Sequence, residues 1–352
     1  MRILHVVGAR PNFIKAAPVL RALSSRTAAQ QILVHTGQHY DKNLSEVFFE
    51  QLGIPQPEFN LEVGSGSHAA QTAEIMRRFE SVALEQKPEV VVVYGDVNST
   101  VAAALVCSKL LVPVAHVESG LRSFDRTMPE EINRLVTDHL SDFLFTPSAD
   151  GDRNLANEGV AKDKIFCVGN VMIDTLVTLL PMAERCPKNG LPERYALVTL
   201  HRPSNVDDSA TLQRILRSLA EVSEQLAVVF PAHPRTQCRI AEFGTKVERL
   251  HIIDPVPYIE FLALQKRATV VITDSGGIQE ETTYLGVPCL TVRNNTERPV
   301  TTILGTNVLV GQESERLAAE LAKILSGQAK RGSIPPLWDG HAGERIAKLL
   351  VG

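Results

Sequence analysis

Short apolar segments rich in β-branched residues recur along the chain, separated by amphipathic segments. They cover residues 3–7, 32–36, 90–94, 112–118, 143–147, 196–200, 226–231, 270–273 and 289–292. Apolar runs of this length are typical of strands that are buried on both faces, as in parallel sheets covered by helices. The pattern therefore predicts an α/β protein.

The amphipathic segments between these runs predict helices. The clearest are 99–110, 130–140, 209–222 and 314–325, several of which open with Ser, Asp or Pro. The segment 183–194 interrupts the alternation with two prolines, a glycine and five charged residues, after which a second series of strands and helices begins. We place a linker at about 165–194 and expect two Rossmann-like halves that face a cleft.

Composition agrees with two domains and excludes some partners. A chain of 352 residues that is 44% hydrophobic exceeds the size at which one core usually divides. Its 36 basic and 40 acidic residues give a net charge of −4, which provides no electrostatic footprint for nucleic acid or an anionic membrane. Five scattered cysteines without a C-x-x-C pair, and a first segment too short for a signal peptide, predict reduced thiols and a cytoplasmic protein.

Charged and glycine-rich segments follow the predicted strands directly. They cover residues 8–15, 37–41, 95–100, 118–131, 201–205, 233–236, 274–277 and 293–299. Ligands of open parallel sheets bind beyond the carboxyl ends of the strands, so these segments are where we expect the chemistry.

The sequence TDSGG at 273–277 predicts an anion site at the start of a helix. Gly276 and Gly277 let the backbone approach a ligand, the first amides of the helix favour negative charge, and Ser275 adds a hydroxyl donor. Glu281 lies about one helical turn further, where a carboxylate can accept hydrogen bonds from ribose hydroxyls. The alternative is an ordinary cap of the helix by Asp274 or Ser275.

Basic residues at other strand exits are candidates for the same anion. Arg10 and Lys15 lie at a predicted helix start, where a cation is unfavourable unless an anion is close. His201 and Arg298 follow later strands and can donate to a phosphate, although His201 could instead be structural. Neither G-x-G-x-x-G nor a P-loop occurs, which argues against NAD and ATP.

Carboxylates gather at the strand exits of the first half. Asp96, Glu118 and Glu130 could form an acid–base cluster with separated pKa values. The alternatives are that Asp96 caps a helix, and that Glu130 and Glu131 only compensate the helix dipole. The histidines are not at metal-ligand spacings, so we expect no metal site.

Nine motifs give the chain a resemblance to the non-hydrolysing UDP-N-acetylglucosamine 2-epimerases over nearly its whole length. They are GARPNFIKAAP, TGQHYD, YGDVNST, HVESGLRSFDRTMPEEINR, LHR, HPR, TDSGGIQEE, TERP and GTNVLVG. The resemblance implies the GT-B architecture, in which the last helix returns to the first domain. We therefore expect one domain at 1–168 plus 335–352 and another at 169–334.

The resemblance also implies the roles of the site residues. UDP would lie in the cleft, on residues Arg10, Lys15, His201, Phe261, Ser275, Gly276, Gly277, Glu281 and Arg298. Asp96, Glu118 and Glu130 match acidic positions implicated in catalysis, and we count His201 with them as a catalytic residue. Arg134 matches an arginine near the sugar. Gln38 and His39 match a second, regulatory substrate site, but Ala70 stands where regulated members have an arginine.

The implied reaction is the reversible conversion of UDP-N-acetylglucosamine into UDP-N-acetylmannosamine by a homodimer without a cofactor. Because the C2 proton of a hexose is not acidic, inversion requires either oxidation of a neighbouring carbon or loss of the anomeric substituent, and we expect elimination and re-addition of UDP. The alternatives are a 2-epimerase of a UDP-2,3-diacetamido uronic acid, a hydrolysing 2-epimerase, a GT-B glycosyltransferase and a non-catalytic nucleotide-sugar sensor.

Overall fold

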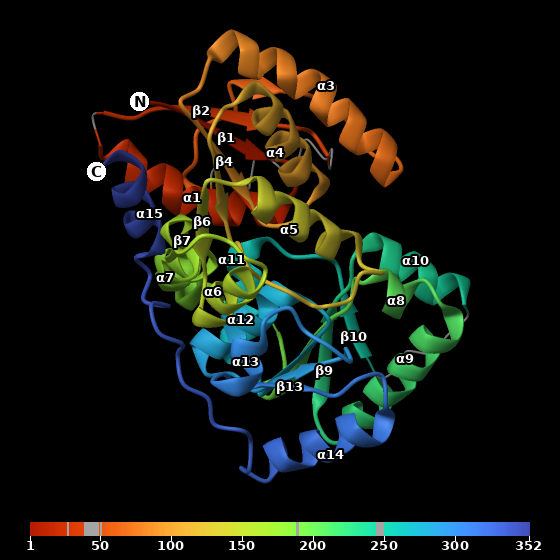
Figure 1. The fold of residues 1–352 in the computed structure, drawn as a ribbon. Coiled ribbons are helices and arrows are strands. Elements are labelled where there is room, and N and C mark those ends of the chain that lie inside the picture. The colour runs from red at the N-terminus through yellow and green to blue at the C-terminus, as the bar shows by residue number, and fades with distance from the viewer. Residues whose placement is uncertain (27, 39–48, 50, 188–189, 244–249) are drawn as a thin grey trace. The chain divides into compact units, whose positions relative to one another are not determined.

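The computed structural model describes residues 1–26, 28–38, 49, 51–187, 190–243 and 250–352 (Figure 1). The chain divides into two compact units. Unit 1 comprises Met1–Thr178 and Pro336–Gly352, and unit 2 comprises Leu179–Pro335. Each unit contains one parallel sheet with helices packed on it, as the alternation of apolar and amphipathic segments predicts.

Seven strands form the sheet of unit 1, in the order β3-β2-β1-β4-β5-β6-β7. Their bounds are β1 Arg2–Val7, β2 Gln30–His35, β3 Phe59–Asn60, β4 Val90–Tyr94, β5 Val114–Val117, β6 Phe143–Thr146 and β7 Ile165–Cys167. The strand order changes direction between β1 and β4, which pair in parallel with Ile3 opposite Val90. Such a switch point leaves room for a ligand beyond the carboxyl ends of the two strands.

The helices of unit 1 follow these strands. They are α1 (Arg10–Ser24), α3 (His68–Gln86), α4 (Asn98–Leu110), α5 (Pro129–Leu140), α6 (Ala149–Asn157), the first half of α7 (Val171–Arg185) and α15 (Ala342–Val351), with a short 3-10 helix η1 at Lys162–Lys164. The C-terminal helix α15 packs against α1. Gly343 makes this packing close, because a Cβ there would lie 2.7 Å from the carbonyl oxygen of Pro18.

Six strands form the sheet of unit 2, in the order β10-β9-β8-β11-β12-β13. They are β8 (Tyr195–Thr199), β9 (Ala227–Pro231), β10 (Leu250–Ile253), β11 (Val270–Thr273), β12 (Cys289–Thr291) and β13 (Asn307–Leu309). The helices are α8 (Pro203–Val206), α9 (Ser209–Ser223), α10 (Pro234–Glu242), α11 (Tyr258–Arg267), α12 (Gly276–Leu285), α13 (Pro299–Ile303) and α14 (Ser314–Leu325). Here the switch point lies between β8 and β11.

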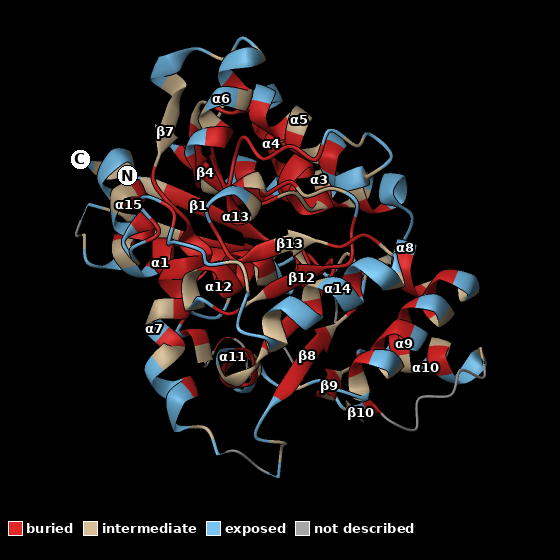
Figure 2. Cartoon of the chain, turned by 90° about the horizontal axis from the view of Figure 1, so that it is seen from below, coloured by how far each residue is buried: buried red, intermediate tan, exposed pale blue. Residues whose placement is uncertain are grey.

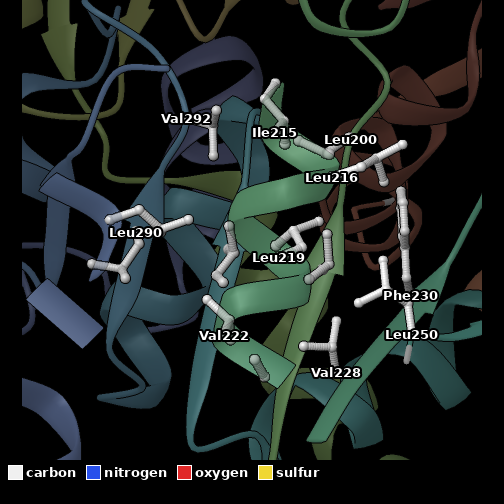
Figure 3. Close-up of a cluster of buried hydrophobic side chains, with 14 of the residues drawn as sticks. Leu200, Ile215, Leu216, Leu219, Val222, Val228, Phe230, Leu250, Leu290 and Val292 are labelled. Atoms are coloured by element: carbon white, nitrogen blue, oxygen red, sulfur yellow. The ribbon is translucent and has the colours of Figure 1, made fainter. Parts of the chain in front are cut away.

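Both faces of the unit 2 sheet are buried, which explains why its strands read as continuous apolar runs. Along β8, Ala196 and Val198 join one hydrophobic cluster, and Tyr195 and Leu197 join the cluster on the opposite face. Figure 3 shows the first cluster, in which Leu219 of α9 packs among strand residues. The strands are mostly buried and the outer faces of the helices are exposed (Figure 2).

The units divide inside helix α7, between Thr178 and Leu179, whereas the sequence placed the boundary at 168/169 in an irregular linker. The first half of α7 belongs to unit 1 because the Thr175 hydroxyl donates to the Ile14 carbonyl at 2.6 Å. In its second half, the carbonyl of Glu184 accepts from Arg267 at 3.2 Å, within unit 2. Most of the expected linker is therefore strand β7 and helix α7.

Four strands were absent from the sequence prediction, namely β3, β7, β10 and β13. All four are edge strands of the two sheets, and they have only two to four residues each. An edge strand is covered less completely, so its sequence lacks the long apolar run that marks a central strand.

Candidate functional site

Lys15 and Glu118 form a buried ion pair at the carboxyl ends of the unit 1 strands. The Lys15 Nζ lies 2.8 Å from Oε2 of Glu118, with side chains 5% and 3% exposed. The glycine that follows β4 makes room for the ammonium, because a Cβ on Gly95 would lie 2.7 Å from Nζ. Glu118 has a left-handed backbone with φ 72°, which is uncommon for a residue other than glycine. Lys15 lies in the second turn of α1, which begins at Arg10, and its anionic partner is Glu118.

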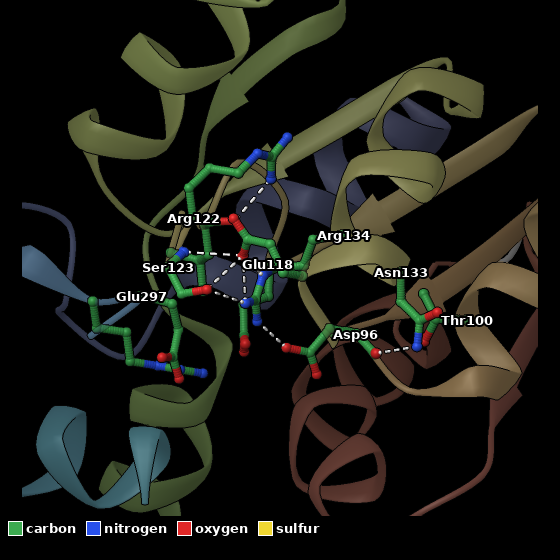
Figure 4. A network of polar contacts seen from close by, with 12 residues as sticks. Asp96, Thr100, Glu118, Arg122, Ser123, Asn133, Arg134 and Glu297 are labelled. Atoms are coloured by element: carbon green, nitrogen blue, oxygen red, sulfur yellow. Dashed lines mark hydrogen bonds and ion pairs between the residues drawn. The ribbon is translucent and has the colours of Figure 1, made fainter. Parts of the chain in front are cut away.

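Arg134 of α5 joins two further carboxylates. One nitrogen of its guanidinium, Nη1, is paired with Oδ2 of Asp96, and another, Nη2, lies 2.6 Å from Oε2 of Glu131. The guanidinium also lies 3.4 Å from the hydroxyl of Ser123 (Figure 4). Asp96 does not cap α4. The N-cap residue is Val97, and the Asp96 carboxylate accepts a hydrogen bond from Arg134.

The two adjacent glutamates of α5 differ sharply. Glu131 is buried, and its carboxylate accepts backbone N–H groups of Ser123 and Phe124, both at 2.9 Å. Burial alone would raise the pKa of Glu131, but the Ser123 and Phe124 amides and the Arg134 guanidinium together hold that pKa below its usual value. Glu130 is exposed at the first turn of the same helix. Glu131 therefore has a structural task, and Glu130 is available to a ligand.

The start of α12 in unit 2 is surrounded by buried arginines. The guanidinium of Arg298 lies against the helix start, since a Cβ on Gly276 would come within 2.2 Å of its Nη1. Arg298 is paired with Glu297 at 2.5 Å and with Glu280 at 3.0 Å. The arginines lower the pKa of Glu297 well below its usual range despite burial, and Arg293 lies 2.7 Å from it. The helix dipole and these guanidinium groups suit an anion.

Asp274 connects the exit of β11 to the loop after β8. Its carboxylate accepts from the backbone N–H of Arg202 at 2.9 Å, from Nδ2 of Asn205 at 3.0 Å, and lies 2.9 Å from Nδ1 of His201. Burial would raise the pKa of Asp274, but the contact with His201 and the other donors lower it. The carboxylate is fully buried, whereas more than half of the His201 side chain is exposed. Asp274 therefore orients His201 instead of capping α12.

Glu281 lies one turn into α12 and is almost fully buried. Its Oε1 accepts the Tyr258 hydroxyl at 2.6 Å, and the amide of Gln265 lies 2.9 Å from Oε2. Burial raises the pKa of Glu281 to about 7, and it also raises the pKa of Tyr258 well above its usual value. Phe261, on the same helix as Tyr258, is partly buried and packs against the hydrophobic cluster that contains Tyr195 and Leu264.

The other predicted residues occupy varied surroundings. Arg10 is exposed at the start of α1. Gln38 is buried, and its side-chain oxygen accepts the Ser99 hydroxyl at 2.8 Å at the start of α4. His39 lies outside the described residues. Ser275 is the N-cap of α12, and its side chain makes no capping hydrogen bond.

Sequence reasoning missed Glu131, Asp274, Tyr258 and the buried pair His116–Asp138. Each acts by holding another group, so no spacing rule marks it. Asp274 did lie within a strand-exit segment, and its position directly after an apolar strand was the available signal. In the part of the chain that the structure describes, no three His, Cys, Asp or Glu side chains could hold a metal ion together.

The chain is similar in sequence and in structure to known nucleotide-sugar epimerases. A family model described as UDP-N-acetylglucosamine 2-epimerase matches residues 21–351. A solved UDP-GlcNAc 2-epimerase of Methanocaldococcus jannaschii, in complex with UDP-GlcNAc and UDP, is 44% identical with a TM-score of 0.94 and 99% coverage of both chains. An enzyme of Neisseria meningitidis bound to UDP-GlcNAc is 29% identical, with a TM-score of 0.89 and full coverage of both chains.

A further relative is the UDP-2,3-diacetamido-2,3-dideoxy-D-glucuronate 2-epimerase of Pseudomonas aeruginosa. It is 44% identical over 354 residues, which cover 100% of this chain and 99% of the relative. The chain has two parallel sheets covered by helices, with charged residues directly after the strands, and this architecture matches the solved epimerase structures. The class of the protein is therefore an epimerase with the GT-B fold. The chain belongs to the UDP-N-acetylglucosamine 2-epimerase family and is an isomerase.

Proposed function

We propose that the chain interconverts UDP-N-acetylglucosamine and UDP-N-acetylmannosamine by eliminating UDP and adding it back. A carboxylate removes the C2 proton, the C1–O bond to UDP breaks, and a 2-acetamidoglucal forms. Protonation of C2 from the opposite face and attack of UDP on C1 then give the epimer. The electron pair of the C2–H bond becomes the C1–C2 double bond, and the pair of the C1–O bond leaves with UDP, so no redox partner is required.

UDP is the group with the largest developing charge, and unit 2 supplies the groups that stabilise it. The backbone amides at the start of α12, with Ser275, Gly276 and Gly277, donate hydrogen bonds to the diphosphate, as do His201 and Arg298. Glu281 holds the ribose hydroxyls, and Phe261 contributes an apolar surface for the base. In unit 1, Arg10 and Lys15 are the proposed UDP-sugar-binding residues, with Lys15 beside its partner Glu118.

Unit 1 supplies the acid–base groups. Inversion at C2 requires one group on each face of the carbon, and Asp96, Glu118 and Glu130 are the three candidates. Asp96 and Glu118 follow the neighbouring parallel strands β4 and β5, so their backbones start from adjacent positions of one sheet edge. Glu130 lies exposed at the first turn of α5, where a ligand can reach its carboxylate.

One observation carries this assignment. Two carboxylates at adjacent strand exits are each paired with a buried cation, Glu118 with Lys15 and Asp96 with Arg134. Buried charges of this kind are seldom kept for stability alone, since apolar replacements often serve as well. Their concentration at the carboxyl ends of β4 and β5, next to the switch point between β1 and β4, supports a catalytic task.

The test is incubation with UDP-N-acetylglucosamine in D₂O, followed by NMR. We expect deuterium at C2 together with UDP-N-acetylmannosamine. Free N-acetylmannosamine would indicate hydrolysis, and no exchange would refute the proposal. Because a relative of equal identity acts on UDP-2,3-diacetamido-2,3-dideoxy-D-glucuronate, that nucleotide sugar is tested in parallel. A kcat/KM higher for it than for UDP-N-acetylglucosamine would reassign the sugar.

The proposal includes a cytoplasmic homodimer. All five cysteines are free, which agrees with a reducing compartment. None of the helices in the described ranges is long and apolar enough to cross a membrane. Light scattering during size-exclusion chromatography measures the mass, and twice the 38.5 kDa of one chain is the expected result.

A further inference from the structure

Side chains from three different elements hold the backbone on which Asp96 stands. The carbonyl of Tyr94 accepts from Asn12 of α1 at 2.7 Å, that of Gly95 from Nε2 of His116 at 2.8 Å, and that of Asp96 from Asn133 of α5 at 2.9 Å. Three consecutive carbonyls at the end of β4 are thus fixed by side chains. Figure 4 shows the last of these contacts.

Of these donors, His116 is the one on β5, the strand that leads to Glu118. Its Nδ1 lies 2.6 Å from Oδ1 of Asp138, and the Oδ2 of that carboxylate accepts the backbone N–H of Gly120 at 3.1 Å. Arg122 lies 2.7 Å from the same Oδ2. His116, Asp138 and Arg122 are all buried. One carboxylate therefore connects the segment after β4, through His116, with the segment after β5.

The backbone at these two exits requires such support. Gly95, Glu118 and Gly120 all have left-handed conformations, with φ of 64°, 72° and 77°. A non-glycine residue such as Glu118 keeps the left-handed backbone conformation only where contacts with the surrounding structure hold it there. Such strained residues cluster at active sites. The His116 and Asp138 contacts lie directly beside Asp96 and within two residues of Glu118.

The two ring nitrogens of His116 face an oxygen atom each, so the ring is held at both ends, by Asp138 and by the Gly95 carbonyl. Burial would raise the pKa of Asp138, but His116 and Arg122 lower it. The Nε and Nη2 atoms of Arg122 in turn donate to the carboxylate of Glu158, both at 2.7 Å. Arg122 is therefore the cationic partner of both carboxylates, Asp138 and Glu158.

We propose that His116 and Asp138 are positioning residues of the epimerase reaction, which fix the Asp96 and Glu118 carboxylates relative to each other by holding the backbones of their two strand exits. They touch no substrate. This inference rests on the proposed function, because it assigns Asp96 and Glu118 to proton transfer at C2. Loss of His116 or Asp138 should therefore slow proton transfer at C2 and leave the binding of UDP, which we assign to unit 2, little changed.

The test compares H116A and D138N with the wild type, using UDP-N-acetylglucosamine with protium or deuterium at C2. A displacement of about 1 Å at a reacting group costs about 100-fold in rate, so we expect kcat to fall by about that factor. The isotope effect on kcat should rise, since proton removal becomes more strongly rate-limiting. KM and the Kd for UDP should change less than about threefold, because a misplaced base removes little ground-state binding.

Two further variants separate positioning from general loss of folding. D174N is the matched control, because Asp174 is also a buried carboxylate of unit 1 and accepts the backbone N–H groups of Ala342 and Gly343 at 3.1 and 2.7 Å. We expect D174N to lower Tm without changing the isotope effect. H116Q keeps an N–H donor for the Gly95 carbonyl and should recover at least about tenfold in kcat over H116A.

Equal isotope effects in H116A, D138N and the wild type would overturn the inference, as would kcat losses no larger than that of D174N at equal folded fraction. The proposed function fails separately, if the wild type incorporates no deuterium at C2. Wild-type exchange without a specific defect in H116A and D138N removes only the positioning role.

Discussion

The Nζ atom of Lys15 lies 2.8 Å from Oε2 of Glu118, and solvent reaches almost none of either side chain. Lys15 belongs to α1 and Glu118 follows β5, so the pair joins elements that are about a hundred residues apart in sequence. It also places a fixed positive charge at the exits of β4 and β5.

Replacing Lys15 by Met should therefore leave Glu118 buried without its cation. We expect a loss of about 3 kcal/mol in the free energy of unfolding of unit 1, because breaking one side of a buried pair strands the other charge. Urea unfolding followed through Trp338 fluorescence measures this, since the single tryptophan is buried in unit 1.

The double variant K15M/E118Q provides the control. It should recover at least half of the lost stability while remaining inactive, because no charge is then left unpaired. Additive losses in the double variant would contradict the interpretation of a coupled pair.

The neighbouring glutamates of α5 give a matched comparison. E130Q should lower kcat about 100-fold with unchanged stability, because Glu130 is exposed and is proposed as an acid–base group. E131Q should cost about 2 kcal/mol of stability, because the Glu131 carboxylate accepts two backbone N–H groups and pairs with Arg134. Activity assays and Trp338-monitored unfolding measure the two effects. An active E130Q would remove Glu130 from the catalytic set.

Glu281 predicts a dependence of stability on pH. Burial raises its pKa from 4.5 to about 7 in the folded state, so the folded protein favours the neutral form. The stability contributed by this group is present below about pH 4.5 and is lost as pH rises towards 7. Above pH 7, E281Q should therefore be more stable than the wild type, by an amount on the order of 3 kcal/mol.

Circular dichroism during urea unfolding at pH 5 and pH 8.5 measures this difference. At pH 5 it should shrink to about 1 kcal/mol or less. E281Q should nevertheless bind UDP more weakly, since the ribose loses a carboxylate acceptor. A stability difference between E281Q and the wild type that is the same at both pH values would show that Glu281 does not carry the buried charge.

Gly276 should not tolerate a side chain. G276A places a Cβ 2.2 Å from Nη1 of Arg298, whose guanidinium is held by buried Glu297 and Glu280 and has little freedom to move. We expect a stability loss of about 1–3 kcal/mol, and at least a tenfold loss of UDP affinity as Arg298 leaves the helix start. Calorimetry with UDP measures the affinity. G66A is the control, because a Cβ there meets no atom within 4 Å, and it should bind UDP normally.

The central strands and their exits were predictable because burial on both faces leaves a continuous apolar run. The edge strands β3, β7, β10 and β13 were not, since their short segments carry no such run. The boundary within α7 was also beyond the sequence pattern. Its two halves have the same helical periodicity, and only their contacts, such as Thr175 with Ile14, assign them to different units.

At the site, the strand-exit rule found charged groups at the carboxyl ends of the strands, including Asp96, Glu118 and His201. It did not find the residues that hold them. Asp138 lies near the end of a helix and His116 within a strand, and each is identified only by partners distant in sequence, Gly120 and Gly95. Positions defined by tertiary contact leave no local signal.

The return of helix α15 to unit 1 has a consequence for biosynthesis. Unit 2 is one uninterrupted stretch of chain, whereas unit 1 lacks the helix that covers α1 until the last residues have been made. During translation, the side of α1 that α15 covers stays exposed while the whole of unit 2 is synthesised. Completion of the first-made half is therefore the final folding event, and a ribosome that stops shortly before Ala342 releases a chain whose earliest domain is the unfinished one.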